Sequence, residues 1–252
     1  MQRNNIFIIA HRGYSSKYPE CTELAFEKAL ETDVDFLEID IRETKDRKIV
    51  IFHDDDLSPK TSIKGNVGDY SFDELSKVSI EAGFGNKYGF QPIILVDTVL
   101  NKIKGNTVRL CVELKDVSRK YIDGYEDFVV SKFREYNFID RLVFNVRNLE
   151  FIKVCREKYP QIPIALEFMP DSYDSSGIDS YINIIVSLGI QIVEYDFQKM
   201  RKDVAYKLKA KGIAIWPWTI NTESQLIKAL DMGADAILTD DPWLIKKLLS
   251  VN

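Results

Sequence analysis

The stretch "FLEIDIRETKDRKIVIF", residues 36–52, decides how the rest of the chain is arranged. It holds two apolar runs, 36–41 and 49–52, on either side of the polar segment "RETKDRK". This connection is too short for the crossover between two parallel strands, which needs about a dozen residues or more. The two runs are therefore predicted to form an antiparallel hairpin with its turn centred near Asp46.

The remaining apolar runs are typical of parallel strands. Together with the hairpin, nine strand candidates are visible: 6–10, 36–41, 49–52, 109–114, 142–146, 162–168, 190–195, 212–218 and 236–239. Segments of helical period, such as "ECTELAFEKALET" and "TESQLIKALDMG", separate most of them, which indicates repeated βα units. Since the run 49–52 belongs to the hairpin, eight strands remain for a parallel sheet.

Eight βα units in about 250 residues predict an α/β protein with a (β/α)8 TIM barrel. We expect a single domain over residues 1–252, with a small insertion at about 42–92 after the second barrel strand. A doubly wound open sheet is the alternative. It is less favoured because no glycine-rich dinucleotide fingerprint follows the first strand.

Composition excludes several classes of protein. Among 252 residues, 45% are hydrophobic and 29% charged, which is typical of a globular domain with a sizeable core. The net charge of −5 argues against a nucleic-acid-binding protein, which would carry a basic excess. The three cysteines, Cys21, Cys111 and Cys155, show no CxxC spacing, so buried reduced thiols are expected rather than disulfides or a zinc site.

No segment suggests a membrane anchor. The apolar run near the N-terminus is too short for the hydrophobic region of a signal peptide, and no later run approaches the length of a membrane span. We therefore expect a cytoplasmic protein without stable membrane insertion. The sequence leaves the oligomeric state open.

In a barrel of this kind, chemistry is located at the carboxyl ends of the strands. The polar residues expected there are His11, Arg12, Glu38, Asp40, Glu113, Lys115 and Trp218. Side chains at positions i and i+2 of a strand face the same side, so the second barrel strand presents two carboxylates together and the third adds another. Three carboxylate ligands suit Mg²⁺ or Ca²⁺.

The hairpin brings a second histidine to the same rim, because His53 should return to about the level of Asp40. A lone histidine at a strand end is more often a surface residue. Here two imidazoles and three acids converge with Arg12, a set that suits phosphoryl transfer with acid–base catalysis. In the run after His53, Asp54 is expected to orient a neighbour or cap the turn, whereas Asp55 and Asp56 are expected to be solvated.

Several motifs in order along the chain resemble the glycerophosphodiester phosphodiesterase family: "AHRG" (10–13), "FLEIDIRETKD" (36–46), "IVIFHDDDL" (49–57), "CVELK" (111–115), "PWTINT" (217–222) and "GADAILTDDP" (233–242). The resemblance implies a TIM barrel with an insertion after the second strand. It implies that His11 and His53 are the acid–base pair. It also implies that a divalent metal ion binds the three acids, Glu38, Asp40 and Glu113. It further implies that Arg12 and Lys115 contact the phosphate and that Trp218 lines the substrate pocket.

The activity implied by the resemblance is metal-dependent hydrolysis of a small-molecule glycerophosphodiester to sn-glycerol 3-phosphate and an alcohol. The alternatives are a lysophospholipase D, a phosphatidylinositol phospholipase C-like enzyme, and a catalytically silent barrel that serves as a binding module. The chain departs from the family where Cys21 replaces the usual asparagine. The aromatic residues of the insertion are expected to pack its own small core: Tyr70, Phe72, Phe84, Tyr88 and Phe90.

Overall fold

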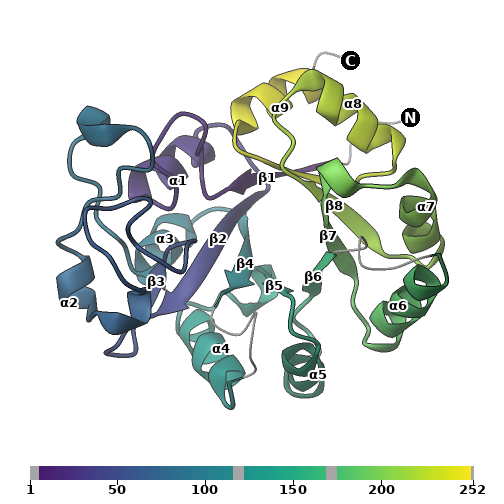
Figure 1. The fold of residues 1–252 in the computed structure, drawn as a ribbon, viewed down its shortest axis with the longest axis horizontal. Helices are drawn as coiled ribbons and strands as arrows, with labels where there is room; N and C mark the ends of the chain where they lie inside the picture. Colours follow the sequence, from purple (N-terminus) through teal and green to yellow (C-terminus); the bar gives the residue numbers. More distant parts are fainter. Residues whose placement is uncertain (1–5, 116–121, 169–174, 251–252) are drawn as a thin grey trace.

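The computed structural model describes residues 6–115, 122–168 and 175–250. Eight parallel strands form a nearly closed barrel ringed by helices (Figure 1), as predicted. In order around the sheet they are β8 (Ala214–Trp218), β7 (Ile192–Asp196), β6 (Ile164–Phe168), β5 (Leu142–Val146), β4 (Arg109–Leu114), β2 (Phe36–Glu43), β1 (Phe7–His11) and β9 (Ala236–Thr239). Between β8 and β9, the Asp235 N–H donates to the Ile215 carbonyl at 2.9 Å.

Helices cover the outside of the barrel and follow the strands in sequence (Figure 1). They are α1 (Glu23–Leu30), α3 (Val96–Ile103), α4 (Tyr125–Glu135), α5 (Leu149–Lys158), α6 (Ser175–Ser187), α7 (Lys202–Ala210), α8 (Glu223–Asp231) and α9 (Pro242–Ser250). Side-chain caps fix where several of them begin. The side chains of Thr22, Asn148 and Thr222 accept hydrogen bonds from first-turn N–H groups of α1, α5 and α8.

The predicted hairpin is present. Strand β3 (Ile49–Ile51) pairs antiparallel with the end of β2, with Ile41 opposite Ile51 and Glu43 opposite Ile49. This register centres the turn on Asp46. The Phe52 N–H then donates to the Asp40 carbonyl at 3.0 Å, and His53 follows one residue later at the mouth of the barrel.

The segment between β2 and α3 has a small apolar core of its own. It also contains two 3₁₀ turns, η1 (Val67–Asp69) and η2 (Gly85–Tyr88), and the short helix α2 (Phe72–Leu75). Tyr70 and Phe72 pack on this core, as expected. The expectation is wrong for Phe84, Tyr88 and Phe90, which lie outside it, with Phe90 58% exposed.

Inside the barrel, residues from all eight strands form a closed apolar layer: Ile9, Phe36, Cys111, Val143, Ala165, Ile192, Trp216, Ala236 and Leu238. A larger apolar core lies between the strands and the helices. Because alternate side chains of a strand face the same side, the residues two positions later form the next layer toward the carboxyl ends of the strands. That layer is the floor of the site described below.

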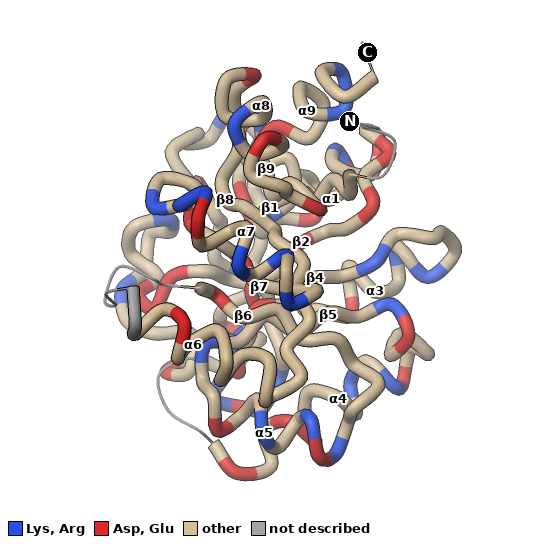
Figure 2. Tube along the Cα trace, turned by 90° about the vertical axis from the view of Figure 1, so that its right-hand side faces the viewer, with Lys and Arg blue, Asp and Glu red and all other residues tan. Residues whose placement is uncertain are grey.

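The surface carries charges of both signs. Figure 2 shows lysine, arginine, aspartate and glutamate interspersed over the side that faces the viewer. All three cysteines are buried free thiols. Over the described ranges, no helix has both the length and the apolar character needed to cross a membrane.

Candidate active site

A layer of mostly polar side chains lies directly above the apolar layer of the barrel. It contains His11, Glu38, Glu113, Asn145, Glu167, Glu194 and Trp218, each two residues after a member of the apolar layer. The strand register pairs six of them two by two, with His11 opposite Glu38, Glu113 opposite Asn145 and Glu167 opposite Glu194. Sequence analysis predicted four of the seven and missed Asn145, Glu167 and Glu194. Each of these three lies two residues after an apolar residue that faces the inside of the barrel, and this spacing was the signal that could have identified them.

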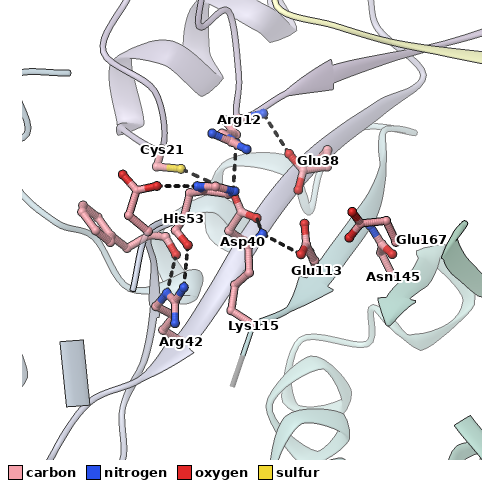
Figure 3. A network of polar contacts seen from close by, with 12 residues as sticks. Arg12, Cys21, Glu38, Asp40, Arg42, His53, Glu113, Lys115, Asn145 and Glu167 are labelled. Atoms are coloured by element: carbon pink, nitrogen blue, oxygen red, sulfur yellow. Dashed lines mark hydrogen bonds and ion pairs between the residues drawn. The ribbon is translucent and has the colours of Figure 1, made fainter. Parts of the chain in front are cut away.

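The three predicted metal ligands lie together on β2 and β4 (Figure 3). One oxygen each of Glu38, Asp40 and Glu113 lies within 4.8 Å of the others. Burial, and next the charge of Asp40, raise the pKa of Glu38 well above its ordinary value and that of Glu113 to about 7. A divalent cation would relieve this repulsion, so the donor set fits a hard metal ion.

Two cations neutralise the most deeply buried of these acids. Asp40, with no exposed surface, lies between the Nε atom of Arg12 at 3.2 Å and the Nζ atom of Lys115 at 3.1 Å. Burial alone would raise the pKa of Asp40, but Lys115 and then Arg12 lower it below its ordinary value. Lys115 also contacts Glu113 Oε1 at 2.5 Å, so its ammonium bridges two of the three carboxylates.

The loop after β1 is held tightly against the site. Arg12 has a positive φ of 56°, and its backbone N–H donates to Glu38 Oε2 at 3.0 Å. Its Nη1 atom donates to Glu20 at 3.1 Å. Gly13 follows with φ +85°, and a Cβ there would lie 2.7 Å from the carbonyl carbon of Ala25 in α1. Only glycine therefore allows this close approach of the loop to the helix.

His11 is held by a carboxylate from the opposite end of the chain. Its Nδ1 donates to Asp240 Oδ1 at 2.7 Å, while Ser15 and Asn221 also donate to Asp240. Burial would raise the pKa of Asp240, but its hydrogen bond with His11 contributes to lowering it to about 2. Asp240 thus fixes the imidazole and leaves Nε2 for a substrate. Sequence analysis missed this residue, although "TDDP" directly follows the last strand.

His53 has an equivalent partner next to it in the sequence. Its Nδ1 lies 2.7 Å from Asp54 Oδ1, which confirms the orienting role predicted for Asp54. Burial lowers the pKa of His53. Asp55 and Asp56 are both exposed, as predicted; Asp55 accepts a hydrogen bond from Arg42 at 2.9 Å, and Asp56 accepts one from the Ser58 N–H.

Two connected cavities meet at these residues. The inner one, of about 60 Å³, is lined by both histidines, the polar layer and Trp218, whose Nε1 is buried without a hydrogen-bond partner among the described residues. Among the described residues, the outer one, of about 300 Å³, is lined by His53 and by six charged side chains: Arg42, Asp54, Asp55, Glu113, Lys115 and Arg147. Arg147 is paired with Glu167. A ligand in the outer cavity would therefore meet a polar wall.

Cys21 sits beside the site in a conformation that suits another residue. It is 1% exposed, has φ 60°, and its sulfur lies 4.0 Å from Asp40 Oδ2. The left-handed region costs most L-residues about 1–2 kcal/mol, whereas asparagine tolerates it. We expect Cys21→Asn to raise the melting temperature by about 2–4 °C, an effect of about 1 kcal/mol.

Thermal unfolding followed by circular dichroism checks this expectation. Cys21→Ser is the matched control, because serine has a similar size without asparagine's tolerance of positive φ. A lower melting temperature for Cys21→Asn, or an equal rise in Cys21→Ser, would show that backbone conformation is not the cause.

Comparisons with known proteins agree on one family. The model of the glycerophosphoryl diester phosphodiesterase family matches residues 11–244. An uncharacterised protein of Bacillus subtilis is 31% identical, with 96% of this chain and 98% of that protein covered. A glycerophosphodiester phosphodiesterase of Bacillus altitudinis is 30% identical, with coverages of 93% and 94%. An Oleispira antarctica phosphodiesterase, solved with the product sn-glycerol 3-phosphate, superposes with a TM-score of 0.81 at 24% identity, covering 96% of each chain.

Proposed function

Since the chain belongs to the glycerophosphoryl diester phosphodiesterase family, we propose that it hydrolyses a glycerophosphodiester to sn-glycerol 3-phosphate and an alcohol. One observation carries the proposal. His11 and His53, each backed by a carboxylate, line one cavity with the cations Arg12 and Lys115 and with two of the three clustered acids, and the third, Asp40, lies buried next to them. This set provides proton transfer and charge stabilisation, which hydrolysis of a phosphodiester requires.

The cofactor we propose is Mg²⁺ or Ca²⁺, held by Glu38, Asp40 and Glu113. When bound, such an ion supplies positive charge that stabilises the transition state at the phosphate. Lys115 now bridges Asp40 and Glu113, so it would leave these acids when they take a cation. It would then be available to bind the phosphate together with Arg12.

We assign the general base to His11 and the general acid to His53. His11, fixed by Asp240, takes the proton of the attacking oxygen as the new phosphorus–oxygen bond forms. The bond to the alcohol oxygen breaks, and His53 gives that oxygen a proton. The assignment rests on the cavities: both histidines line the inner one, but only His53 lines the outer, which is large enough for the departing alcohol.

The outer cavity also suggests the type of alcohol. Because its wall consists of charged groups and an imidazole, it favours a small polar alcohol over an acyl chain. The buried indole N–H of Trp218 is a donor for a substrate oxygen in the inner cavity. Three reduced thiols suit a reducing compartment, so we place the reaction in the cytoplasm, as a step of glycerol and lipid metabolism.

Two assays, a coupled one for glycerol 3-phosphate and a second one for lysophosphatidic acid, test the function. The purified chain is incubated with a panel of glycerophosphodiesters and lysophospholipids, with and without Mg²⁺, Ca²⁺ or Mn²⁺. We expect metal-dependent release of glycerol 3-phosphate from glycerophosphodiesters. Preferential cleavage of lysophospholipids to lysophosphatidic acid would favour the lysophospholipase D alternative, and inactivity on the whole panel would favour a silent barrel.

Metal affinity should depend on pH. With a pKa of about 7, Glu113 is largely protonated at pH 6 and ionised at pH 8, and only the ionised form is a good ligand. We expect metal affinity to be about tenfold weaker at pH 6 than at pH 8. Titration calorimetry on the metal-free protein measures this. Glu113→Gln should show weaker binding and a smaller pH dependence, whereas equal affinity of the unmodified protein at both pH values would contradict the role of Glu113.

A further inference from the structure

Exposed lysines and exposed or half-buried aromatic side chains gather at one place on the carboxyl-end face of the barrel. We call this the aromatic rim and define it by Lys17, Phe84, Lys87, Tyr88, Phe90 and Trp243. Phe90 is 58% and Trp243 50% exposed. The residues come from the loop after β1, from η2 with the residues flanking it, and from the start of α9.

Contacts join these segments into one surface. The hydroxyl of Tyr88 donates to the Lys17 carbonyl at 2.5 Å, and its ring lies 5.6 Å from that of Phe84. The Nζ atom of Lys17 lies 5.4 Å from the ring centre of Trp243, and that of Lys87 lies 4.8 Å from the ring centre of Tyr88. The loop after β1 therefore links the insertion to α9.

Three glycines of the turn that carries Phe84 and Tyr88 face open space, while Tyr88 itself packs on Tyr18, with ring centres 5.2 Å apart. Gly83, Gly85 and Gly89 all have positive φ, and a Cβ added at any of them would meet nothing within 4 Å. The glycines are therefore needed for their positive φ angles, which set the shape of the turn, and not for close packing against neighbouring atoms. The aromatic side chains between them are held at the surface by one another and by Lys87, which also lies over Phe84 at 5.9 Å.

The aromatic rim lies beside the entrance to the active site. In the loop that carries Lys17, Ser15 donates to Asp240, the partner of His11, and Tyr14 donates to Asp241 at 2.8 Å. Trp243 follows Asp241 by two residues. A partner seated on the rim would therefore face the mouth of the barrel.

We propose that the aromatic rim docks the enzyme reversibly onto anionic lipid bilayers. Aromatic rings combined with lysines are the composition that settles at the interface between lipid and water. Three ammonium groups lie over aromatic rings here, on Lys17, Lys87 and Lys247, whose Nζ is 5.2 Å from the ring centre of Trp243. Among the described residues, Asp241, 3.9 Å from Lys17, is the carboxylate paired with these lysines, and Asp240 beside it is held by His11, Ser15 and Asn221.

The local excess of positive charge selects an anionic over a zwitterionic surface. Since the whole chain has a net charge of −5, we expect attraction to an anionic bilayer to act through this local surface and to weaken as salt screens it. Docking would bring the mouth of the barrel to the layer of lipid head groups. The bond-breaking chemistry stays the same, so turnover of a soluble diester does not depend on the rim.

Sedimentation with sucrose-loaded vesicles tests the proposal. The full chain is mixed with phosphatidylcholine vesicles with or without phosphatidylserine, at low and high salt. We expect binding that requires phosphatidylserine and falls with salt. The triple variant Lys87→Glu, Phe90→Ser, Trp243→Ser should lower the partition coefficient by about tenfold or more.

A matched control lies on the far side of the barrel, on α7 (Figure 1). Tyr206 is 53% exposed and Lys202 lies 5.7 Å from its ring centre, so Lys202→Glu with Tyr206→Ser removes the same kind of contact and the same charge. This variant should bind vesicles like the unmodified protein. Both variants should retain the unmodified rate on soluble glycerophosphocholine, which keeps docking and catalysis separate.

Three results would overturn the proposal. They are failure of the unmodified protein to sediment with phosphatidylserine vesicles at low salt, equal binding to pure phosphatidylcholine, and equal loss of binding in the control variant. Analytical ultracentrifugation adds a fourth. A dimer that the triple variant disrupts, without vesicle binding, would assign the rim to a second copy of the chain. If the unmodified protein does not turn over glycerophosphocholine, that result counts against the proposed function. The vesicle-binding result can still be interpreted by itself.

Discussion

His11→Ala and His53→Ala are each expected to lower kcat by about 10²- to 10⁴-fold, because each removes one of two proton transfers. The imidazoles lie in one cavity but are held by different carboxylates, His11 by Asp240 and His53 by Asp54. Neither histidine can replace the other. The double variant should lose less than the product of the two single losses if the pair acts as a unit.

The leaving group distinguishes the two roles. A p-nitrophenyl phosphodiester needs little help from an acid, so it should largely restore turnover in His53→Ala but not in His11→Ala. Rates on this substrate and on glycerophosphocholine are compared after circular dichroism and metal analysis of each variant. Rescue of His11→Ala instead would reverse the assignment, and unimpaired activity in either variant would remove that histidine from the mechanism.

Asp40→Asn is expected to destabilise the fold by about 1–3 kcal/mol in the presence of a chelator. The change removes the carboxylate that Arg12 and Lys115 share and leaves each with a single carboxylate partner, Glu20 for Arg12 and Glu113 for Lys115. Equilibrium unfolding in urea measures the loss. Catalysis should fall as well, because one of three metal ligands is weakened.

Glu113→Gln is the control for that loss of stability. Lys115 keeps Asp40 as a partner in this variant, and Glu113 is already partly protonated near neutral pH. The free energy of unfolding at pH 7 should therefore change much less than in Asp40→Asn, while metal affinity falls in both. Equal destabilisation by the two substitutions would mean that the charge balance around Asp40 is not what holds this part of the fold.

The sequence was sufficient to predict the barrel because its strands and the hairpin follow from local patterns. The length of the segment 42–48 excludes a parallel crossover, and the two-residue period places Glu38 with Asp40 on one face. The predicted strands all occur, with ends shifted by at most two residues. The predicted site residues also lie at one rim, because the carboxyl ends of parallel strands meet there.

Other parts of the site depend on contacts that no local pattern contains. Asp240 reaches His11 across 229 residues of sequence, so only closure of the barrel brings them together. The pairing of Lys115 with two carboxylates depends on side-chain conformation at a crowded rim. Phe84, Tyr88 and Phe90 lie outside the small core because an irregular turn rich in glycine carries them, and neither a helical nor a strand period predicts such a turn.

Closure of the barrel by β1 and β9 also sets the order of events during protein synthesis. Strand β1 leaves the ribosome before the other strands of the barrel. Its neighbour in the sheet, β9, leaves after all of them, and Asp240 directly follows β9 in the sequence. Until then His11 has no carboxylate to orient it, and one edge of the sheet is unpaired. Nascent chains therefore cannot orient His11 until β9 and Asp240 have been made, and during that time the open edge is exposed to aggregation and to chaperones.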